Sequence, residues 1–224
     1  MLYSILRPLA HAVAKVLFRV GVSGREHIPA TGPVLLVGNH SSFLDPPLVG
    51  AVITRHLTYM AKAELFKVPF LGALISRVNA KPVRREGGYA AALRVALRTL
   101  QEGGALVMFP EGTRGPEGTL REPKPGAAML AVMSGATVVP AYIEGSGRAW
   151  PRGQALPKPV KIRIRFGAPL TFARRAADGS KTDYEMVGRE MMAAIGRLKD
   201  GPAPSGTTAA TGAPARSGAR AGVR

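Results

Sequence analysis

The sequence contains no cysteine and has few aromatic and acidic residues. Without cysteine the chain has no disulfide, no thiolate nucleophile, and no cysteine-ligated zinc or iron–sulfur centre. Only 14 of the 224 residues are Asp or Glu against 31 that are Lys or Arg, so the formal net charge is +17. Such an excess predicts an anionic partner: nucleic acid, an anionic membrane surface, or a phosphorylated or CoA-like ligand.

Long uninterrupted hydrophobic runs are also missing. The longest uncharged segment, 125–143, contains Gly, Ser, Thr and Pro and is expected to form a helix and a strand, not a membrane span. A secretory signal is not expected either, because Arg7, Lys15 and Arg19 interrupt the first twenty residues. The overall composition, 46% hydrophobic and 20% charged, excludes a chain that is disordered throughout and suits one folded domain with appendages.

Residues 1–20 are predicted to form an amphipathic helix. Its apolar residues recur at steps of three and four: Leu2, Ile5, Leu6, Leu9, Val13, Val16, Leu17 and Val20. A second face without acids carries basic residues at steps of four: Arg7, His11, Lys15 and Arg19. An apolar stripe beside a basic one is typical of a helix that lies in a membrane interface, which is the interpretation we favour. The alternative is a helix that packs its apolar stripe on its own domain and leaves the basic side in solvent.

The remaining chain divides into a folded domain, residues 21–198, and a disordered basic tail, residues 199–224, made mainly of small residues and Arg. Within the domain, apolar runs predict strands at 34–38, 58–61, 81–83, 105–109, 137–143 and 160–166. Helices are predicted between and after them at 46–53, 69–78, 88–100, 127–133 and 182–198. This alternation predicts an α/β fold with helices packed around a largely parallel central sheet.

Two of these elements carry more detailed expectations. In the strand 160–166, alternation predicts a buried face of Ile162, Ile164 and Phe166 and an exposed basic face of Lys161, Arg163 and Arg165. In the helix 182–198, the side chains predicted to face inward are Met186, Met191, Met192 and Ile195.

A histidine, His40, follows the expected strand 34–38, at the carboxyl end where ligands bind in such folds. Of the four histidines, only His40 has a carboxylate nearby in sequence, Asp45, that could accept a hydrogen bond from one ring nitrogen and leave the other as a base. The pair has no nucleophile of its own, so the activated hydroxyl is expected to belong to the substrate. Ser41 and Ser42 are expected to bond within the turn or cap the next helix. The alternative is an ordinary strand-to-helix turn with a local hydrogen bond.

A second polar cluster, Phe-Pro-Glu-Gly-Thr-Arg at 109–114, follows the expected strand 105–109. Arg114 suits bidentate binding of phosphate, and Gly112 lets the backbone come close to a ligand. Glu111 would accept hydrogen bonds from ligand hydroxyls or hold Arg114 in place. The alternative is a surface turn with an ion pair between Glu111 and Arg114.

A further basic point, Arg84 and Arg85, follows the expected strand 81–83, and for at least one of the two the alternative of a solvated basic turn is favoured. No second metal-ligating side chain stands at ligand spacing beside His40, so neither a metal nor a resident cofactor is expected.

The two polar clusters resemble motifs of a known family. Residues 39–45, Asn-His-Ser-Ser-Phe-Leu-Asp, resemble the NHxxxxD motif of the glycerolipid acyltransferases, and residues 109–114 resemble their FPEGTR motif. Further similarity lies, in the family's order, at residues 61–66, 79–85 and 138–140. The chain is most similar to the bacterial 1-acyl-glycerol-3-phosphate (lysophosphatidic acid) acyltransferases. It departs from the pattern at Asn79, where the family usually has glycine, and at Gly115, where serine is common.

The resemblance implies a glycerol-3-phosphate acyltransferase-like fold and an enzyme of the 1-acylglycerol-3-phosphate O-acyltransferase class. His40, oriented by Asp45, would take the proton from the free hydroxyl of 1-acyl-sn-glycerol-3-phosphate. That oxygen would attack the thioester of acyl-CoA or acyl carrier protein and give phosphatidic acid for phospholipid biosynthesis. The residues implied to bind the acceptor's glycerol phosphate are Arg85, Glu111, Gly112, Thr113 and Arg114. Val139 and Pro140 would shape the acyl or acceptor pocket, and the enzyme would be peripheral or monotopic on the cytoplasmic face of the cell membrane.

Other acceptors remain open at this point: another lysophospholipid, a glycolipid or an ornithine lipid. A basic nucleic-acid-binding module is a distant alternative, because aromatic residues make up only 6% of the chain and the positive charge is scattered. A hydrolase is disfavoured because no Gly-x-Ser-x-Gly elbow accompanies the histidine.

Overall fold

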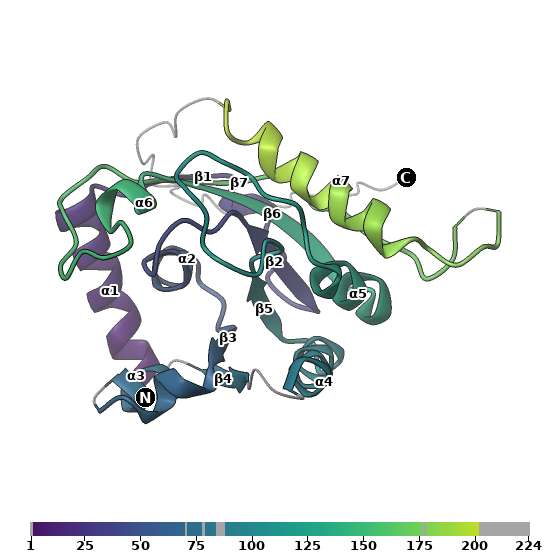
Figure 1. Cartoon of the computed structure of the whole chain (residues 1–224), viewed down its shortest axis with the longest axis horizontal. Coiled ribbons are helices and arrows are strands. Elements are labelled where there is room, and N and C mark those ends of the chain that lie inside the picture. The colour runs from purple at the N-terminus through teal and green to yellow at the C-terminus, as the bar shows by residue number, and fades with distance from the viewer. Residues whose placement is uncertain (1, 70, 78, 84–87, 177, 202–224) are drawn as a thin grey trace, which may run out of the picture.

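The computed structural model describes residues 2–69, 71–77, 79–83, 88–176 and 178–201. These residues form a seven-stranded sheet in the order β1–β7–β6–β2–β5–β3–β4 (Figure 1). The strands are β1 (Gly21–Ser23), β2 (Val34–Gly38), β3 (Leu57–Lys62), β4 (Ala80–Val83), β5 (Ala105–Met108), β6 (Thr137–Glu144) and β7 (Arg163–Phe166). Neighbouring strands are parallel except for β6 and β7, which are antiparallel. The predicted α/β fold with a largely parallel sheet is confirmed.

Helices cover both faces of the sheet. They are α1 (Leu2–Phe18), η1 (Arg25–His27), α2 (Asp45–Val52), η2 (Ala63–Lys67), α3 (Leu71–Arg77), α4 (Gly88–Gln101), α5 (Pro125–Ser134), α6 (Ser146–Ala149) and α7 (Tyr184–Arg197). One core lies between the sheet and helices α1 and α2. A second core lies between the other face of the sheet and helices α4, α5 and α7 (Figure 1). The sequence therefore folds into three layers, as the alternation of strands and helices predicts.

The central strand β2 is buried at every position. Val34 and Leu36 enter the core beneath α1 and α2, whereas Leu35 and Val37 enter the opposite core. A strand covered on both faces needs an apolar side chain at every position, which explains the continuous run Val-Leu-Leu-Val. The run ends at Gly38 and delivers the chain to the polar residues that follow.

The expectation of an exposed basic face on β7 is wrong for Arg165, whose side chain is buried. Strand β7 lies between β1 and β6, so both of its edges are covered. On the antiparallel neighbour β6, Glu144 accepts hydrogen bonds from Arg163 at 3.1 Å and from Arg165 at 3.0 Å. The shared carboxylate offsets the cost of burying the Arg165 charge, a partnership that strand alternation alone does not reveal.

The inward face of α7 was also predicted partly wrongly. Met191, Met192 and Ile195 are buried as expected, but Met186 is 64% exposed. The buried face begins instead at Val187, which lies one turn before Met191. Met186 precedes Val187 by one residue and is therefore rotated by about 100° away from the core.

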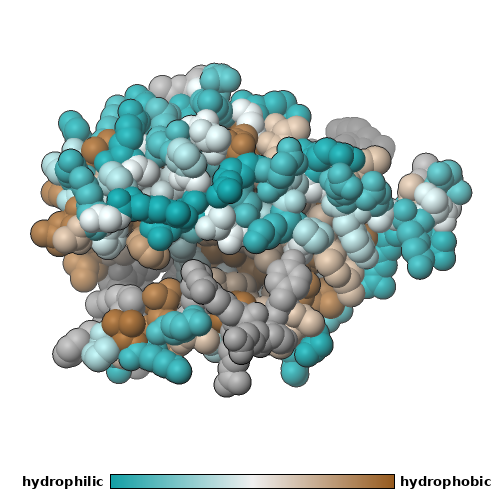
Figure 2. Space-filling view, viewed as in Figure 1, coloured by the Kyte–Doolittle hydropathy of each residue, from teal (hydrophilic) through white to brown (hydrophobic). Residues whose placement is uncertain are grey.

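At the described positions Leu9, Val13 and Val16, the apolar stripe of helix α1 does not pack on the domain. Ala14 and Phe18 are buried against the core, whereas Leu9 is 59%, Val13 47% and Val16 83% exposed. Figure 2 shows apolar side chains along the edge of the molecule where α1 lies. Of the two interpretations of this helix, packing of the apolar stripe on its own domain is wrong for these positions.

Within the part of the chain that the structure describes, no helix is both long enough and apolar enough to cross a membrane. The predicted disordered tail, 199–224, falls outside the described residues from position 202 onward.

Candidate active site

The two polar clusters follow neighbouring parallel strands. His40 comes after β2 and residues 109–114 come after β5, and these strands pair from Val34 with Ala105 to Val37 with Met108. Two backbone contacts join the clusters: the His40 N–H donates to Glu111 Oε1 at 3.0 Å, and the Gly115 N–H donates to the His40 carbonyl at 2.8 Å. Clusters 69 residues apart in sequence therefore form one site at the carboxyl edge of the sheet.

His40 and Asp45 form the hydrogen-bonded pair that their spacing predicts. His40 Nδ1 lies 2.8 Å from Asp45 Oδ2. Since a carboxylate can only accept, Nδ1 carries the proton and Nε2 is left with its lone pair. Among the described residues, no side-chain hydroxyl donates to Nε2. The imidazole can therefore act as a base toward a hydroxyl that a bound molecule supplies.

Asp45 is fully buried at the first turn of α2. Besides the imidazole, its Oδ2 atom accepts the backbone N–H groups of Ser41 and Ser42, each at 2.8 Å. The positive end of the α2 dipole adds to the stabilisation of the carboxylate. Ser42 also bonds within the turn, as expected, because its hydroxyl accepts the Leu44 N–H and donates to the Trp150 carbonyl. Asp45 is thus fixed by backbone donors before it orients the histidine.

Packing on Phe109 sets the plane of the His40 ring. The two rings stack with centroids 4.1 Å apart and planes 16° from parallel. The His40 side chain is 17% exposed, so it remains reachable from solvent while its partner Asp45 is not. The first residue of the second cluster therefore supports the ring of the first.

Glu111 lies beneath this loop and is only 3% exposed. Its contact with the His40 backbone gives it a positioning role that the sequence did not predict, and its expected contact with the acceptor stays a prediction. Burial raises the pKa of the Glu111 carboxyl above its ordinary value near 4.5, and the backbone N–H groups of His40 and Arg121 partly oppose the rise.

The raised pKa of Glu111 makes stability depend on pH. The unfolded chain releases this proton at lower pH than the native protein, so the contribution to stability is complete below the ordinary carboxyl pKa. It is lost as the pH rises through the native pKa. We expect the free energy of unfolding, measured by denaturant titration across this range, to contain a decrease that Glu111→Gln removes. The matched control is Glu102→Gln, at an exposed carboxylate. An unchanged pH dependence in Glu111→Gln would contradict the assignment.

Gly112 and Thr113 form the tip of the second loop. Gly112 has φ +68°, and a Cβ atom there would lie 2.8 Å from Cδ of Lys124. The positive φ favours glycine at this position, whereas the flexible Lys124 side chain could move away from a Cβ atom. Thr113 is exposed, and its Oγ1 lies 3.4 Å from Nη2 of Arg152. This loop tip presents polar groups to solvent at the side of His40.

Arg114 does not pair with Glu111 within the described residues; its guanidinium lies 3.5 Å from the ring centroid of Phe43. Arg152 approaches it from the segment after α6 and donates from Nη2 to the Arg114 carbonyl at 2.6 Å. Burial, then the charge of Arg152, lowers the pKa of Arg114, and the charge of Asp45 opposes this. Since the charge of Arg152 disfavours that of Arg114, an anion bound beside Arg114 would be stabilising there.

The two residues expected to shape a pocket, Val139 and Pro140, lie on β6 and are buried. Successive residues of a strand point to opposite faces. Val139 enters the core beneath α1 and α2, so Pro140 lies on the other face, with Val138 and Tyr142. The structure does not bring these two residues into one pocket wall. Arg85 and its neighbour Arg84 lie outside the described residues.

Sequence reasoning missed two contributors to the site. The Asn39 side chain bonds the backbone of Ile143 in both directions, at 2.9 Å and 2.7 Å, and so fixes the start of the His40 loop to β6. The sequence contained a signal for Asn39, because an Asn side-chain amide can both donate and accept. It can therefore replace backbone hydrogen bonds where a strand ends. Arg152 had none, because it is one arginine in a loop rich in Gly and Pro.

Comparisons with known proteins show which proteins this chain is similar to. A family model described as acyltransferase matches residues 19–144. A 1-acyl-sn-glycerol-3-phosphate acyltransferase of Bacillus subtilis is 32% identical over 152 residues, which are 67% of this chain and 73% of that protein. A chloroplastic 1-acyl-sn-glycerol-3-phosphate acyltransferase of Arabidopsis thaliana is 28% identical over 189 residues, 79% of this chain but only 51% of that protein.

A solved structure is similar over most of the fold. The crystal structure of the 1-acyl-sn-glycerophosphate (LPA) acyltransferase PlsC from Thermotoga maritima superposes with a TM-score of 0.72 at 27% identity. The match covers 88% of this chain and 80% of the Thermotoga protein.

Proposed function

This chain belongs to the acyltransferase family, and from that premise we propose that it acylates the free hydroxyl of 1-acyl-sn-glycerol-3-phosphate to give phosphatidic acid. The proposed donor is a fatty acyl thioester, either acyl-CoA or acyl carrier protein. The observation that carries the proposal is the 2.8 Å contact of His40 Nδ1 with buried Asp45, which leaves Nε2 as a base without a nucleophile of its own.

In the proposed reaction, His40 Nε2 takes the proton of the acceptor hydroxyl as its oxygen attacks the thioester carbonyl carbon. The new C–O bond forms and the C–S bond breaks, and the imidazolium returns its proton to the departing thiolate. Asp45 keeps the imidazole in the correct tautomer and stabilises its positive charge during the step. No group outside the chain and its two substrates is needed.

The acceptor's phosphate is proposed to lie at the guanidinium groups of Arg114 and Arg152, beside the Thr113 hydroxyl. Arg114 is the expected phosphate ligand, and the 2.6 Å bond from Arg152 to its carbonyl places a second cation at the same loop. Planar guanidinium groups match phosphate oxygens better than ammonium groups do. The arrangement favours an acceptor that carries a phosphate over a neutral glycolipid.

Arg152→Ala is expected to raise the KM for lysophosphatidate by about ten- to a hundredfold and to change kcat much less, because a charge-assisted bond contributes about 1.5–3 kcal/mol. Arg148→Ala is the matched control, since Arg148 lies four residues away and its only described partner, Glu144, is 3.9 Å distant. Initial rates at varied acceptor concentration give both constants. Equal KM values in the two variants would exclude Arg152 from acceptor binding.

We propose that α1 attaches the enzyme to the cytoplasmic surface of a membrane. The exposed Leu9, Val13 and Val16 would enter the interface, and the basic residues of the helix would meet anionic head groups. Phosphatidic acid and its precursor reside in bilayers, so this attachment would bring the acceptor to His40.

Val16→Asp is expected to weaken binding to vesicles of phosphatidylglycerol and phosphatidylcholine by at least about tenfold, because burying a valine is worth about 1.5–3 kcal/mol. Val16 is 83% exposed, so the fold should be unaffected. Val95→Asp provides the control, because Val95 is 42% exposed on α4, which packs against the opposite face of the sheet. Sedimentation with vesicles measures the binding. Equal sedimentation of both variants would show that α1 is not the attachment surface.

The proposed function is tested by mass spectrometry of products from purified protein, vesicles, one acyl donor at a time and a mixed panel of lysolipids. Phosphatidic acid is expected with the unmutated protein and not with His40→Ala. Acylation of a different lysolipid would retain the mechanism and overturn the acceptor. Absence of product with either donor would overturn the proposal.

A further inference from the structure

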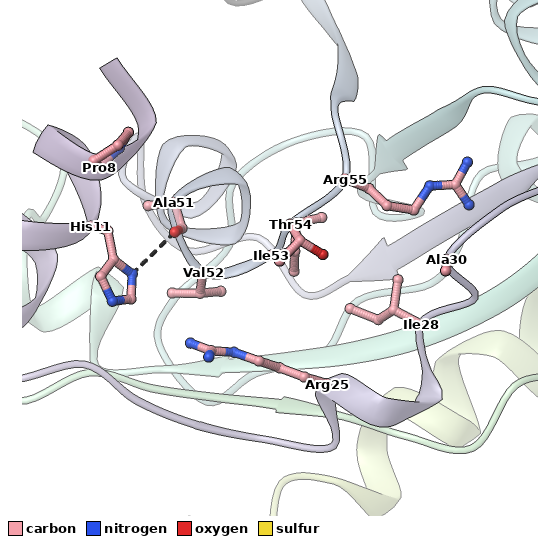
Figure 3. Close-up of a pocket in the computed structure, with 10 residues that line it drawn as sticks. All are labelled: Pro8, His11, Arg25, Ile28, Ala30, Ala51, Val52, Ile53, Thr54 and Arg55. Atoms are coloured by element: carbon pink, nitrogen blue, oxygen red, sulfur yellow. Dashed lines mark hydrogen bonds between the residues drawn. The ribbon is translucent and has the colours of Figure 1, made fainter. Parts of the chain in front are cut away.

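A pocket of about 420 Å³ lies between α1 and the carboxyl end of α2 (Figure 3). Its apolar wall includes Pro8 from α1, Ile28 and Ala30 from the segment after η1, and Val52 and Ile53 from the end of α2. The volume falls within the range of small-molecule sites, about 300–1,000 Å³. Nothing in the mechanism above uses this pocket.

The polar lining of the pocket is basic. His11, Arg25 and Arg55 contribute to its wall, and no Asp or Glu does so among the described residues. In Figure 3 the Arg25 guanidinium and the His11 ring lie toward each other across the pocket, while Arg55 lies at the other end. A concave apolar wall with cations at its ends is complementary to a molecule with an apolar body and an anionic group.

The side chains of His11 and Arg55 are held in place by backbone carbonyls. His11 Nδ1 donates to the Ala51 carbonyl at 3.1 Å, at the carboxyl end of α2. Arg55 donates to the carbonyls of Pro29, Gly32 and Gly103 at 2.8 to 3.1 Å. Carbonyls orient a guanidinium without neutralising it, and burial lowers the pKa of Arg55. The wall therefore holds positive charge that an anion would stabilise.

This pocket is separate from the candidate active site. Asp45 begins α2 and Val52 ends it, and seven steps of about 1.5 Å each place the two sites about 10 Å apart along the helix. Pro8 and His11 belong to α1, whose neighbours Leu9 and Val13 are exposed. The pocket thus opens beside the apolar surface of α1, where an amphiphile would be available.

From the basic ends, the apolar wall and the position beneath α1, we propose that this pocket binds one anionic glycerolipid, with its phosphate at Arg25 and His11 and its chain against Ile28 and Val52. The occupant differs from the acceptor at His40, and binding does not depend on turnover. Inorganic phosphate shares the head-group chemistry, so the experiment separates the two sources.

The test uses phosphatidic acid with a photoreactive diazirine in its acyl chain. The full chain carrying His40→Ala is irradiated with this probe in neutral vesicles, and labelled peptides are located by mass spectrometry. Label is expected on peptides covering residues 8–11, 25–30 and 51–55. Excess unlabelled phosphatidic acid should remove it, whereas diacylglycerol, which lacks the phosphate, should not.

Two variants probe the two halves of the site. Arg25→Glu should reduce the label at least tenfold, and Ala30→Trp should do so by filling the pocket while leaving every charge in place. Arg94→Glu, which makes the same charge change at an exposed position of α4, should keep the label. Thermal melts establish that each variant is folded, and a variant that melts below the assay temperature is replaced by the other.

The outcomes distinguish the proposal from its competitors. Label that survives both Arg25→Glu and Ala30→Trp would overturn the site, and equal competition by diacylglycerol would overturn the anionic specificity. Displacement by inorganic phosphate alone, at the concentration of competing lipid, would overturn the assignment to a lipid. Because the experiment uses the His40→Ala protein, its result is independent of whether the chain acylates lysophosphatidate.

Discussion

His40→Ala is expected to lower kcat by about 10³-fold or more. A positioned general base alone contributes a rate factor of about 10²–10⁴. In the structure the Nε2 atom is the side of the ring that Asp45 leaves without a proton. Alanine removes that base and leaves Asp45 with no imidazole to orient. Product formation at saturating donor and acceptor measures the loss.

The fold should survive this change. The His40 side chain is 17% exposed, and the backbone bonds to Glu111 and Gly115 use main-chain atoms that alanine retains. Far-UV circular dichroism and a thermal melt of His40→Ala should therefore resemble those of the unmutated chain. His56→Ala, at an exposed histidine outside the site, is the control for activity. Turnover by His40→Ala within a few-fold of the control would refute the mechanism.

The sequence predicted the parts of this site that depend on neighbours along the chain. His40 and Asp45 are five residues apart, and the turn into α2 brings their side chains together, so their pairing could be predicted before the distant residues that support the loop were known. The position of each cluster after an apolar run was likewise local information. Because parallel strands end at one edge, local information sufficed to place His40 next to residues 109–114.

Contacts between distant segments could not be predicted. Arg152 reaches the Arg114 carbonyl from 38 positions along the chain, and Arg165 finds Glu144 across an antiparallel pair in an otherwise parallel sheet. A sequence pattern predicts that a charged residue is exposed, because the pattern does not show the partner that would allow its burial. The buried position of Glu111 belongs to the same group, since the sequence shows a polar turn and not what covers it.

The apolar periodicity of helix α1 was similarly limited as a predictor. The apolar stripe of α1 predicts which residues share a face, but not whether protein or lipid covers that face. In the structure Phe18 is buried and Val20 packs partly against the core, whereas Leu9, Val13 and Val16 are exposed, and what covers these exposed positions stays a prediction. Periodicity therefore located the surface and left its partner to be found.

Asp45→Asn is the second large effect, and it tests orientation apart from the base itself. Asp45 Oδ2 accepts from the imidazole and from two backbone N–H groups, all at 2.8 Å. An amide at this buried position keeps one acceptor oxygen but loses the charge and adds an N–H₂ group in place of the second oxygen. The imidazolium formed in the step then has no counter-charge. We expect kcat to fall by about 10²–10⁴-fold, with the KM of both substrates nearly unchanged.

Stability must be measured alongside, because Asp45→Asn also weakens the turn. Loss of charge-assisted bonds to the backbone is expected to cost about 1.5–3 kcal/mol of unfolding free energy. Ser42→Ala is the matched control: it removes the bond from the Ser42 hydroxyl to the Trp150 carbonyl and destabilises the same turn, yet leaves the His40–Asp45 pair intact. If Asp45 acts by orienting the base, Ser42→Ala retains most of its kcat at a temperature where both variants are folded. If kcat falls in proportion to the loss of unfolding free energy in both variants alike, Asp45 acts only as a structural residue of the turn.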